Sequence, residues 1–463
     1  MSAPRSVRLR LVPVLAVLVL LTGCSSTNPT PSIALPATTV PATGQPTTIA
    51  TAETTAEPTV TGTPEPATAP PVQTPESTPQ VTPAPTPSPT AAPTATPAPS
   101  ASPEPSASPA PSASPEPNAT PEPTPTPTPA AGFTKADRLG HDRGAAVAEL
   151  LNDGRVLIAG GWDGSADQST AEIYDPASGA FSGTASMVDR RYFGIGVLLN
   201  DGRVLVAGGW TGTRDTDSAE LYDPAKDAFG TTGSLHEGRG EAAATILADG
   251  RVLVAGGLDG NTVLSSAEIY DPVTGSFKKT ASMAHRRYAA TATLLQDGTV
   301  LVTGGYDGNQ DLASAEIYDP SAGTWRDAGS MSDRRGEHTA TLLPDGTVLI
   351  TGGLDGNRSQ ASADIYDPAT GAFTPTRAMS SKRWWHTATL LTDGTVLVCG
   401  GWDGFKDVKS CDLYDPATRR FTPTDSMSAG RGGATATRLQ DGSVLIAGGW
   451  TGNNPLRSAD LYH

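Results

Sequence analysis

The sequence predicts an all-β fold, a seven-bladed β-propeller built from four-stranded antiparallel blades. The stretch from Asp153 to Gly161, Asp-Gly-Arg-Val-Leu-Ile-Ala-Gly-Gly, returns nearly unchanged every 48 residues. Its further copies begin at Asp201, Asp249, Asp297, Asp345, Asp393 and Asp441. A fixed period of this size marks a supersecondary unit that buries its core only by stacking on its neighbours. An uninterrupted array of such units therefore predicts one closed ring.

The chain begins with an expected export signal, residues 1–23. Three arginines precede a short apolar stretch, Leu11 to Leu21, which is too short to span a bilayer comfortably. Leu21-Thr22-Gly23-Cys24 resembles the lipobox of bacterial lipoproteins. This resemblance implies that Cys24 carries a lipid and anchors the protein to the bacterial cell membrane or cell surface. An ordinary cleaved secretory signal is the alternative, and both place the protein outside the cytoplasm.

Residues 24–132 are expected to form a stalk that begins at the anchor cysteine. Between Ser25 and Ala131 the chain is mostly Pro, Thr, Ala and Ser, without any aromatic residue, Lys or Arg. Such a composition cannot bury enough apolar surface to offset the entropy lost on ordering. It predicts a disordered chain, partly polyproline II, that holds the C-terminal domain away from a surface.

Residues 133–463 carry the repeats, and each repeat predicts four strands. An inner strand leads into the Asp-Gly pair, expected as a two-residue type I′ turn in which both residues have positive φ. The apolar second strand ends at Gly-Gly and should be buried on both faces. Ser-Ala-Glu-Ile-Tyr forms the third strand. Asp271-Pro-Val-Thr-Gly275 then makes a turn with Gly in the left-handed position, and an aromatic residue such as Phe277 opens the fourth strand.

Together these positions resemble the kelch repeat: Gly-Gly, then Tyr-Asp-Pro, an aromatic residue, and Met and Arg before the next unit. The resemblance covers residues 133–463. It implies a kelch-type β-propeller, the fold shared with the central domain of galactose oxidase.

The two ends of the repeat array complement each other. The chain stops after the third strand of the last unit, at Leu461-Tyr462-His463. Phe133 lies 48 residues before Phe181 and so occupies the position of a fourth strand. We therefore expect Phe133-Thr134 to complete the last blade, which closes the ring and removes an open sheet edge.

Two charged columns are expected to be structural. An arginine precedes each inner strand, at Arg143, Arg191, Arg239, Arg287, Arg335, Arg383 and Arg431. An acid lies in each third strand, at Glu172, Glu220, Glu268, Glu316, Asp364, Asp412 and Asp460. Because a buried carboxylate needs a cation, a ring of ion pairs between blades is predicted, with a seven-fold anion site as the alternative. The matching Tyr and Met columns are expected in the core.

Two cysteines, Cys399 and Cys411, occupy positions on adjacent strands where the other repeats have a small residue. Disulfides persist in exported proteins, so a local cross-strand disulfide is one interpretation. Two buried thiols that replace alanine are the other.

Strand alternation predicts one face that varies between repeats. The second-to-third strand loops and the fourth-to-first connections share this face, here called the loop face, and the tight turns share the opposite turn face. Six tryptophans of four contiguous blades are expected on the loop face: Trp162, Trp210, Trp402 and Trp450 directly after Gly-Gly, with Trp384 and Trp385 at the entry to the sixth blade. For the four that follow Gly-Gly, packing beneath the loop is the alternative.

Larger residues also break the symmetry near the axis, where most repeats have Ala, Gly or Thr. They are Tyr192, Phe193, Glu241, Tyr288, Glu337, His338, Trp384, Trp385 and His386. Since packing alone would accept the small residue, these positions are candidates for specific binding. Aromatic rings with a few carboxylates and imidazoles suit stacking on a sugar ring or gripping a polypeptide.

The function predicted from these features is a monomeric, non-catalytic binding module for a glycan or protein ligand, with no cofactor. The alternative is an extracytoplasmic propeller enzyme, metal-dependent or distantly similar to galactose oxidase, that uses His338, His386 and Glu337. The formal net charge of −16 argues against a nucleic-acid partner, and membrane contact is expected through the lipid anchor only.

Overall fold

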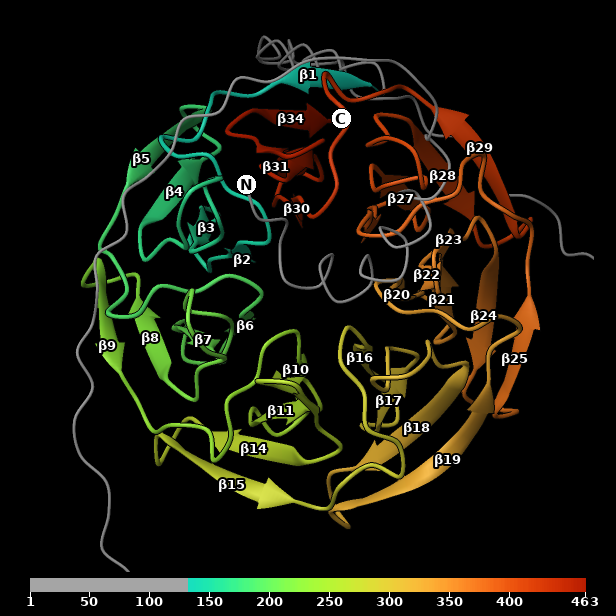
Figure 1. The fold of residues 1–463 in the computed structure, drawn as a ribbon. Helices are drawn as coiled ribbons and strands as arrows, with labels where there is room; N and C mark the ends of the chain where they lie inside the picture. Colours follow the sequence, from blue (N-terminus) through green and yellow to red (C-terminus); the bar gives the residue numbers. More distant parts are fainter. Residues whose placement is uncertain (1–131) are drawn as a thin grey trace, which may run out of the picture. The chain divides into compact units, whose positions relative to one another are not determined.

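The computed structural model describes residues 132–463. They form seven four-stranded antiparallel sheets arranged as blades around a central axis (Figure 1), so the predicted fold class is confirmed. The expected signal peptide, Cys24 and the stalk up to residue 131 lie outside the described residues. Within 132–463, no helix is long and apolar enough to span a membrane.

Each blade runs from an inner strand beside the axis to an outer strand at the rim. Blades 1 to 3 contain β2 (Val147–Leu150), β3 (Val156–Ala159), β4 (Ala171–Asp175) and β5 (Ala180–Gly183); β6 (Ile195–Leu198), β7 (Val204–Ala207), β8 (Ala219–Asp223) and β9 (Ala228–Thr231); and β10 (Ala243–Ile246), β11 (Val252–Ala255), β14 (Ala267–Asp271) and β15 (Ser276–Thr280). Blades 4 and 5 contain β16 (Thr291–Leu294), β17 (Val300–Thr303), β18 (Ser314–Asp319) and β19 (Thr324–Ser330); and β20 (Thr339–Leu342), β21 (Val348–Thr351), β24 (Ala363–Asp367) and β25 (Ala372–Pro375). Blades 6 and 7 contain β26 (Thr387–Leu390), β27 (Val396–Cys399), β28 (Cys411–Asp415) and β29 (Arg420–Thr424); and β30 (Thr435–Arg438), β31 (Val444–Ala447), β34 (Ala459–Tyr462) and β1 (Phe133–Lys135).

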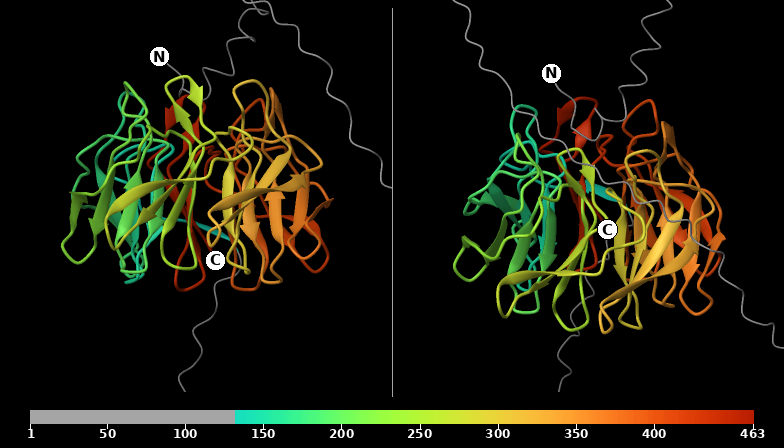
Figure 2. Two further views of the ribbon diagram at one scale, coloured as in Figure 1. Left: turned by 90° about the horizontal axis from the view of Figure 1, so that it is seen from below. Right: turned by 60° about the horizontal axis from the view of Figure 1, so that its bottom comes forward.

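The connections between strands separate onto two faces, as the side views in Figure 2 show. The second-to-third strand loops of blades 3, 5 and 7 fold as short hairpins. Their strands are β12 (Leu258–Asp259) with β13 (Thr262–Val263), β22 (Leu354–Asp355) with β23 (Arg358–Ser359), and β32 (Trp450–Thr451) with β33 (Asn454–Pro455). In blades 1, 2, 4 and 6 the same loop bends back through an isolated bridge to an aspartate instead.

The second strands are buried along their whole length, as predicted. The Asp-Gly turns before them are tight, but the type I′ assignment is wrong. Only the glycine has positive φ, for example Gly154 at +88°, and Leu151 N–H donates to Arg155 O across a three-residue loop. This is a type I turn followed by a left-handed glycine, and the Asp153 carboxylate stabilises it by accepting the Arg155 N–H.

The chain termini close the ring. β1 pairs antiparallel with β34, with Phe133 opposite Tyr462. Figure 1 shows β1 at the outer edge of the blade that holds the C-terminus. The predicted strand exchange is therefore confirmed, and the last blade has the same four strands as the others.

The tyrosines and methionines of the repeated columns lie in the core, as expected. Each third-strand tyrosine contacts the aromatic residue of the fourth strand, with ring centroids 4.7 to 5.0 Å apart. Cys399 and Cys411 are directly opposite each other on β27 and β28, with Cα atoms 4.3 Å apart, and are joined by a disulfide.

The recurring arginines pair with the recurring acids, but the expected pairing between blades is wrong. Arg287 Nη2 lies 2.8 Å from Glu316 Oε1 within its own repeat, and both side chains are buried. Arg287 Nη1 also donates to Gly304 O and Ser314 O of the same blade, whereas its backbone carbonyl accepts the Gly257 N–H of the preceding blade. The arginine therefore joins two blades through its backbone, and its ion pair stays inside one.

Candidate functional site

Seven residues, one from each blade, form a hydrogen-bonded circle around the axis on the loop face. Each lies shortly before an inner strand, and its N–H donates to the carbonyl of the corresponding residue in the preceding blade. The seven N···O distances run from 2.8 to 3.2 Å. We call this circle the axial ring, and its members are Ala145, Phe193, Glu241, Ala289, Glu337, Trp385 and Gly433.

Every member of the axial ring has a left-handed backbone, with φ between 49° and 60°. This conformation costs a residue other than glycine about 1–2 kcal/mol. Glycine is accepted at the position, as Gly433 demonstrates. Large side chains are nevertheless present in four blades, and strain of this type is common at functional sites.

Aromatic side chains from blades 2, 6 and 7 meet across the axial ring. The ring centroid of Phe193 lies 5.6 Å from that of Trp385 and 6.3 Å from that of Trp450. Trp385 stacks on Trp450 at 5.4 Å and contacts Trp384 at 4.6 Å. Tyr192 contacts Phe193 at 4.7 Å. We call these five side chains the aromatic cluster, and all five are residues that the sequence singled out.

Trp450 fits into the cluster because two residues that contact it, Gly144 and Gly433, are glycines. An ideal Cβ on Gly144 would lie 2.2 Å from Trp450 Cε2, and one on Gly433 would lie 2.3 Å from Trp450 Cζ3. The residue before the axial ring alternates between glycine and an aromatic: Gly144, Tyr192, Gly240, Tyr288, Gly336, Trp384 and Gly432. Because the number of blades is odd, the two glycine blades 7 and 1 are neighbours, and Trp450 fills the space between them.

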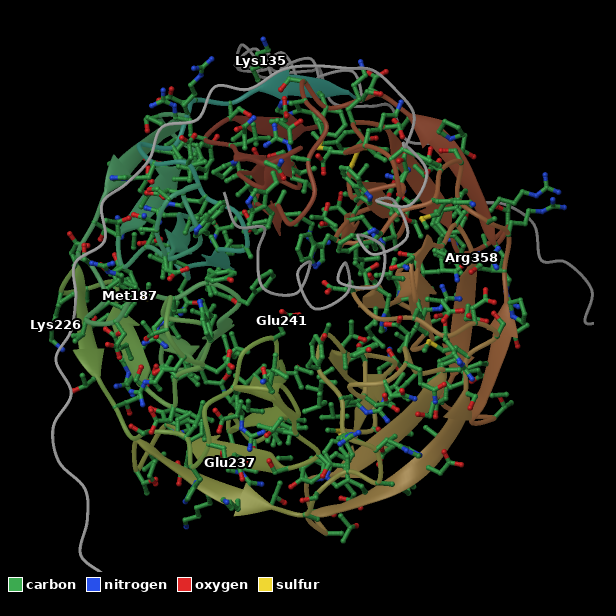
Figure 3. The ribbon with its side chains drawn as sticks, viewed as in Figure 1. Lys135, Met187, Lys226, Glu237, Glu241 and Arg358 are labelled. Carbon is green, nitrogen blue, oxygen red and sulfur yellow. A yellow bond between two sulfur atoms is a disulfide. The ribbon has the colours of Figure 1, made fainter. Side chains whose placement is uncertain are left out.

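Two carboxylates belong to the same circle. Glu241 and Glu337 are the axial-ring members of blades 3 and 5, and Ala289 of blade 4 lies between them. Figure 3 shows Glu241 near the centre of the propeller. The axial ring thus carries aromatic residues on one side and acidic residues on the other.

The two histidines lie outside this arrangement. His338 is 6% exposed, and its Nε2 lies 3.1 Å from Thr291 Oγ1 and 2.8 Å from Thr303 Oγ1 of the preceding blade. His386 makes the equivalent contacts with Thr339 and Thr351. Burial lowers the pKa of His338 to about 3 and that of His386 well below its usual range, so both are neutral.

The remaining aromatic candidates lie outside the aromatic cluster. Trp162, Trp210 and Trp402 are half-buried and pair by backbone bridges with the residue before the axial ring of their own blade. Tyr288 is buried against Tyr306, edge to face at 5.6 Å.

Sequence reasoning missed two further residues that depart from the repeat. Phe405, at the loop tip of blade 6, is 91% exposed. Glu149 lies on the inner strand β2, where five other blades have threonine, and burial raises its pKa to about 7. The threonine column of the repeats made Glu149 visible as a break in symmetry. Phe405 had no such signal, because the loops differ between blades.

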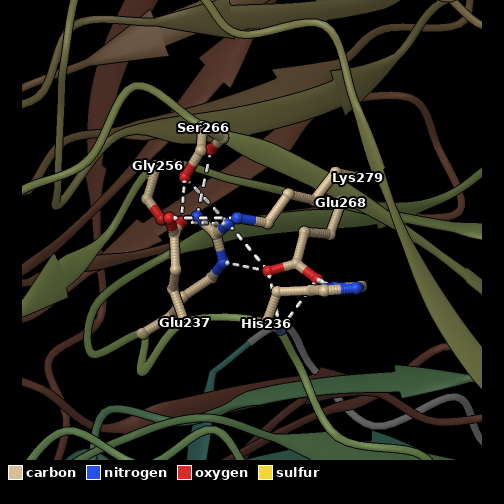
Figure 4. Close-up of polar contacts among 7 residues, drawn as sticks. His236, Glu237, Gly256, Ser266, Glu268 and Lys279 are labelled. Carbon is tan, nitrogen blue, oxygen red and sulfur yellow. Dashed lines mark hydrogen bonds and ion pairs between the residues drawn. The ribbon is translucent and has the colours of Figure 1, made fainter.

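A further group of ionisable side chains surrounds the ion pair of blade 3 (Figure 4). Glu268 accepts from Arg239 and lies 2.6 Å from His236 Nδ1. Glu237 contacts Ser266 Oγ and lies 3.4 Å from Lys279 Nζ. These contacts add to the arginine–acid ion pair that every blade contains. The candidate site remains the axial ring, where large residues replace small ones in four of the seven repeats.

The family comparison identifies the repeat. The kelch motif matches residues 151–188, 191–229, 242–284 and 287–332, which lie in the first four blades. The chain carries kelch motifs. The other three blades repeat the same columns. A search of the curated proteins gave no match.

Solved structures of similar shape support the fold. One is described as a novel fungal alcohol oxidase of the AA5 family in complex with copper; it is 20% identical, with a TM-score of 0.60 over 72% of this chain and 76% of that one. Another is YjhT, 12% identical, with a TM-score of 0.51 over 62% of this chain and 99% of that one. At these identities the likeness extends to the propeller architecture alone.

The described residues of this propeller do not fit a copper centre. No group of three or more His, Cys, Asp or Glu side chains in residues 132–463 could hold a metal ion. His338 and His386 are bonded to threonine hydroxyls, and Cys399 is bonded to Cys411. Tyr462 and His463 also have structural surroundings at the closure of the ring: Tyr462 is buried, and His463 Nε2 is hydrogen-bonded to Thr134 Oγ1.

Proposed function

We propose that the protein is a non-catalytic binding module, anchored outside the cytoplasm through Cys24, that takes a glycan or protein ligand on the loop face. The observation that carries this proposal is the contact of Phe193 with Trp385 and Trp450 across the axial ring. Binding sites combine apolar and aromatic groups with a few well-placed polar ones, and the axial ring does so. The strain held at Phe193 and Trp385, where glycine is accepted in blade 7, is further support.

Binding of the full chain to arrays of glycans and of peptides tests the proposal. Two variants remove the aromatic groups, Trp384→Ala/Trp385→Ala at the axial ring and Phe405→Ser at the loop tip. We expect both to lose at least about tenfold in affinity, as for buried or anchoring aromatics in interfaces. Val273→Ser is the matched control, since Val273 is 93% exposed on the turn face.

Retained binding in the axial-ring and loop-tip variants would place the ligand elsewhere. Absence of binding by the folded wild-type protein to either array would reject the proposal. The thermal midpoint of each variant separates lost binding from lost folding.

Lipid anchoring has its own test. Expression with labelled fatty acid should give a labelled protein in the membrane fraction of a bacterial host, and Cys24→Ser should give an unlabelled protein in the soluble fraction. An equal distribution of both would favour the ordinary secretory signal.

A further inference from the structure

The residue types of the axial ring match on the two sides of Ala289. On either side of Ala289 stand Glu241 and Glu337, and next to these stand Phe193 and Trp385. The small residues Ala145 and Gly433 complete the circle, with Trp450 beside Gly433. The order around the axis is therefore small, aromatic, acidic, small, acidic, aromatic, small, which places paired carboxylates opposite the stacked indoles.

We propose that the axial ring, on the loop face, receives the cationic side chain of a protein partner, an arginine or a lysine. This inference rests on the proposed function and names the class of ligand. Aromatic rings attract a cation, and they do so more strongly where water is excluded. Carboxylates form charge-assisted bonds with ammonium and guanidinium groups. Each carboxylate has about four acceptor positions, so Glu241 and Glu337 can accept further bonds from a ligand beside those they already make.

The geometry favours a side chain over a sugar. A sugar ring stacks on an exposed aromatic face, but the rings of Phe193, Trp385 and Trp450 face one another, and Trp450 is only 4% exposed. A narrow aliphatic chain with a charged end needs no such platform.

The loop face offers a second contact for a protein partner. Phe405 projects from the loop that follows Trp402 and is almost fully exposed. Exposed aromatic side chains near a well-packed centre are typical anchors in protein interfaces. The formal net charge of −16 would also attract a basic partner.

The test uses acetylated hexapeptides that differ at one central residue: arginine, lysine, citrulline, norleucine or glutamate. Binding to the full chain is followed by calorimetry and by tryptophan fluorescence. We expect the arginine and lysine peptides to bind at least about tenfold more tightly than the neutral citrulline and norleucine peptides, and their affinity to fall with added salt. Glu241→Gln/Glu337→Gln should reduce this preference at least about tenfold.

Asp201→Asn/Asp249→Asn is the matched control, because it removes the same two charges from turn-face carboxylates that pair with Arg203 and Arg251. Equal binding of charged and neutral peptides would overturn the cationic ligand while leaving a binding module. Binding of glycans alone would overturn the protein partner. If the folded protein bound none of the peptides and none of the glycans, both this inference and the proposed function would fail.

Discussion

Phe193 and Trp385 contact each other across the axis of the propeller, with ring centroids 5.6 Å apart, although they enter from blades 2 and 6. Both have left-handed backbones, and both belong to a circle of hydrogen bonds that runs through all seven blades. A contact of this kind requires both side chains to turn toward the axis. The closed circle fixes the two backbones for this, since each ring member is bonded to its neighbours on both sides.

The fit of Trp450 between two glycine blades predicts a coupled pair of mutations. Gly144→Ala would place a Cβ 2.2 Å from Trp450 Cε2 and should destabilise the fold by about 1–3 kcal/mol through overpacking. In Gly144→Ala/Trp450→Leu the clash is gone, so the double variant should be no less stable than Trp450→Leu alone. Chemical unfolding measures the coupling, expected at about 1–3 kcal/mol. Gly183→Ala, with open space around the Cβ, serves as control, and additive effects would contradict the fit.

The turn between the third and fourth strands predicts a stabilising mutation. Four blades have a left-handed glycine at its end, whereas blade 2 has Asp227 at φ 48° and blade 6 has Arg419 at φ 53°. Arg419 is exposed, and its backbone carbonyl, which accepts from Thr376 Oγ1, is unchanged by mutation. Arg419→Gly should therefore raise the free energy of unfolding by about 1 kcal/mol. The substitution relieves the backbone strain, and the greater conformational entropy of glycine in the unfolded chain offsets part of this gain. Gly371→Arg at the matching position of blade 5 should lower it by a similar amount, and equal stabilities would refute this explanation.

The buried arginines predict a loss of stability without a loss of binding. Arg287→Met leaves the Glu316 carboxylate buried without its cation and should cost about 3–5 kcal/mol. Arg287→Met/Glu316→Gln should recover part of this cost, since no charge is then left unpaired. Affinity for a ligand of the loop face should stay unchanged in both. Retained stability with lost affinity would instead favour the seven-fold anion site.

The fold could be predicted because each of its elements repeats. The period, the Gly-Gly columns and the complementary ends gave the seven blades and their closure, and they were confirmed by β1 pairing with β34. The turn type was wrong because Asp153 does not share the positive φ of Gly154, and residue type alone does not distinguish the two loops. The sequence likewise gave no sign that Glu241 and Trp385 have left-handed backbones.

The candidate site was predictable residue by residue but not as an arrangement. Broken symmetry marked both Trp385 and His386, yet the axial ring turns Trp385 to the axis while His386 packs on threonines of the preceding blade. Adjacent residues thus have opposite environments. The contact between Phe193 and Trp450 also joins distant repeats, which no local pattern can indicate.

Buried His338 and half-buried Asp407 predict opposite responses to acid. Burial lowers the pKa of His338 to about 3, whereas it raises that of Asp407 to about 6 against the bond from the Gly452 N–H. The unfolded chain binds a proton at His338 below about pH 6.5 that the folded protein refuses, so this histidine lowers stability as the pH falls. At Asp407 the folded protein binds the proton first, so this carboxyl raises stability as the pH falls from about 6 to about 4.

Substitution of His338 and substitution of Asp407 should therefore change the pH dependence of stability in opposite directions. Between about pH 7.5 and pH 4.5, His338→Gln should lose roughly 2 kcal/mol less stability than the wild type, whereas Asp407→Asn should lose more. Urea unfolding at the two pH values measures both differences. Asp249→Asn is the control, because its bond to Arg251 lowers the pKa of this exposed carboxyl and so keeps its titration below the range. Parallel profiles for all variants would mean that neither His338 nor Asp407 is desolvated in the folded protein, and that the contacts between blades on the loop face are open to water.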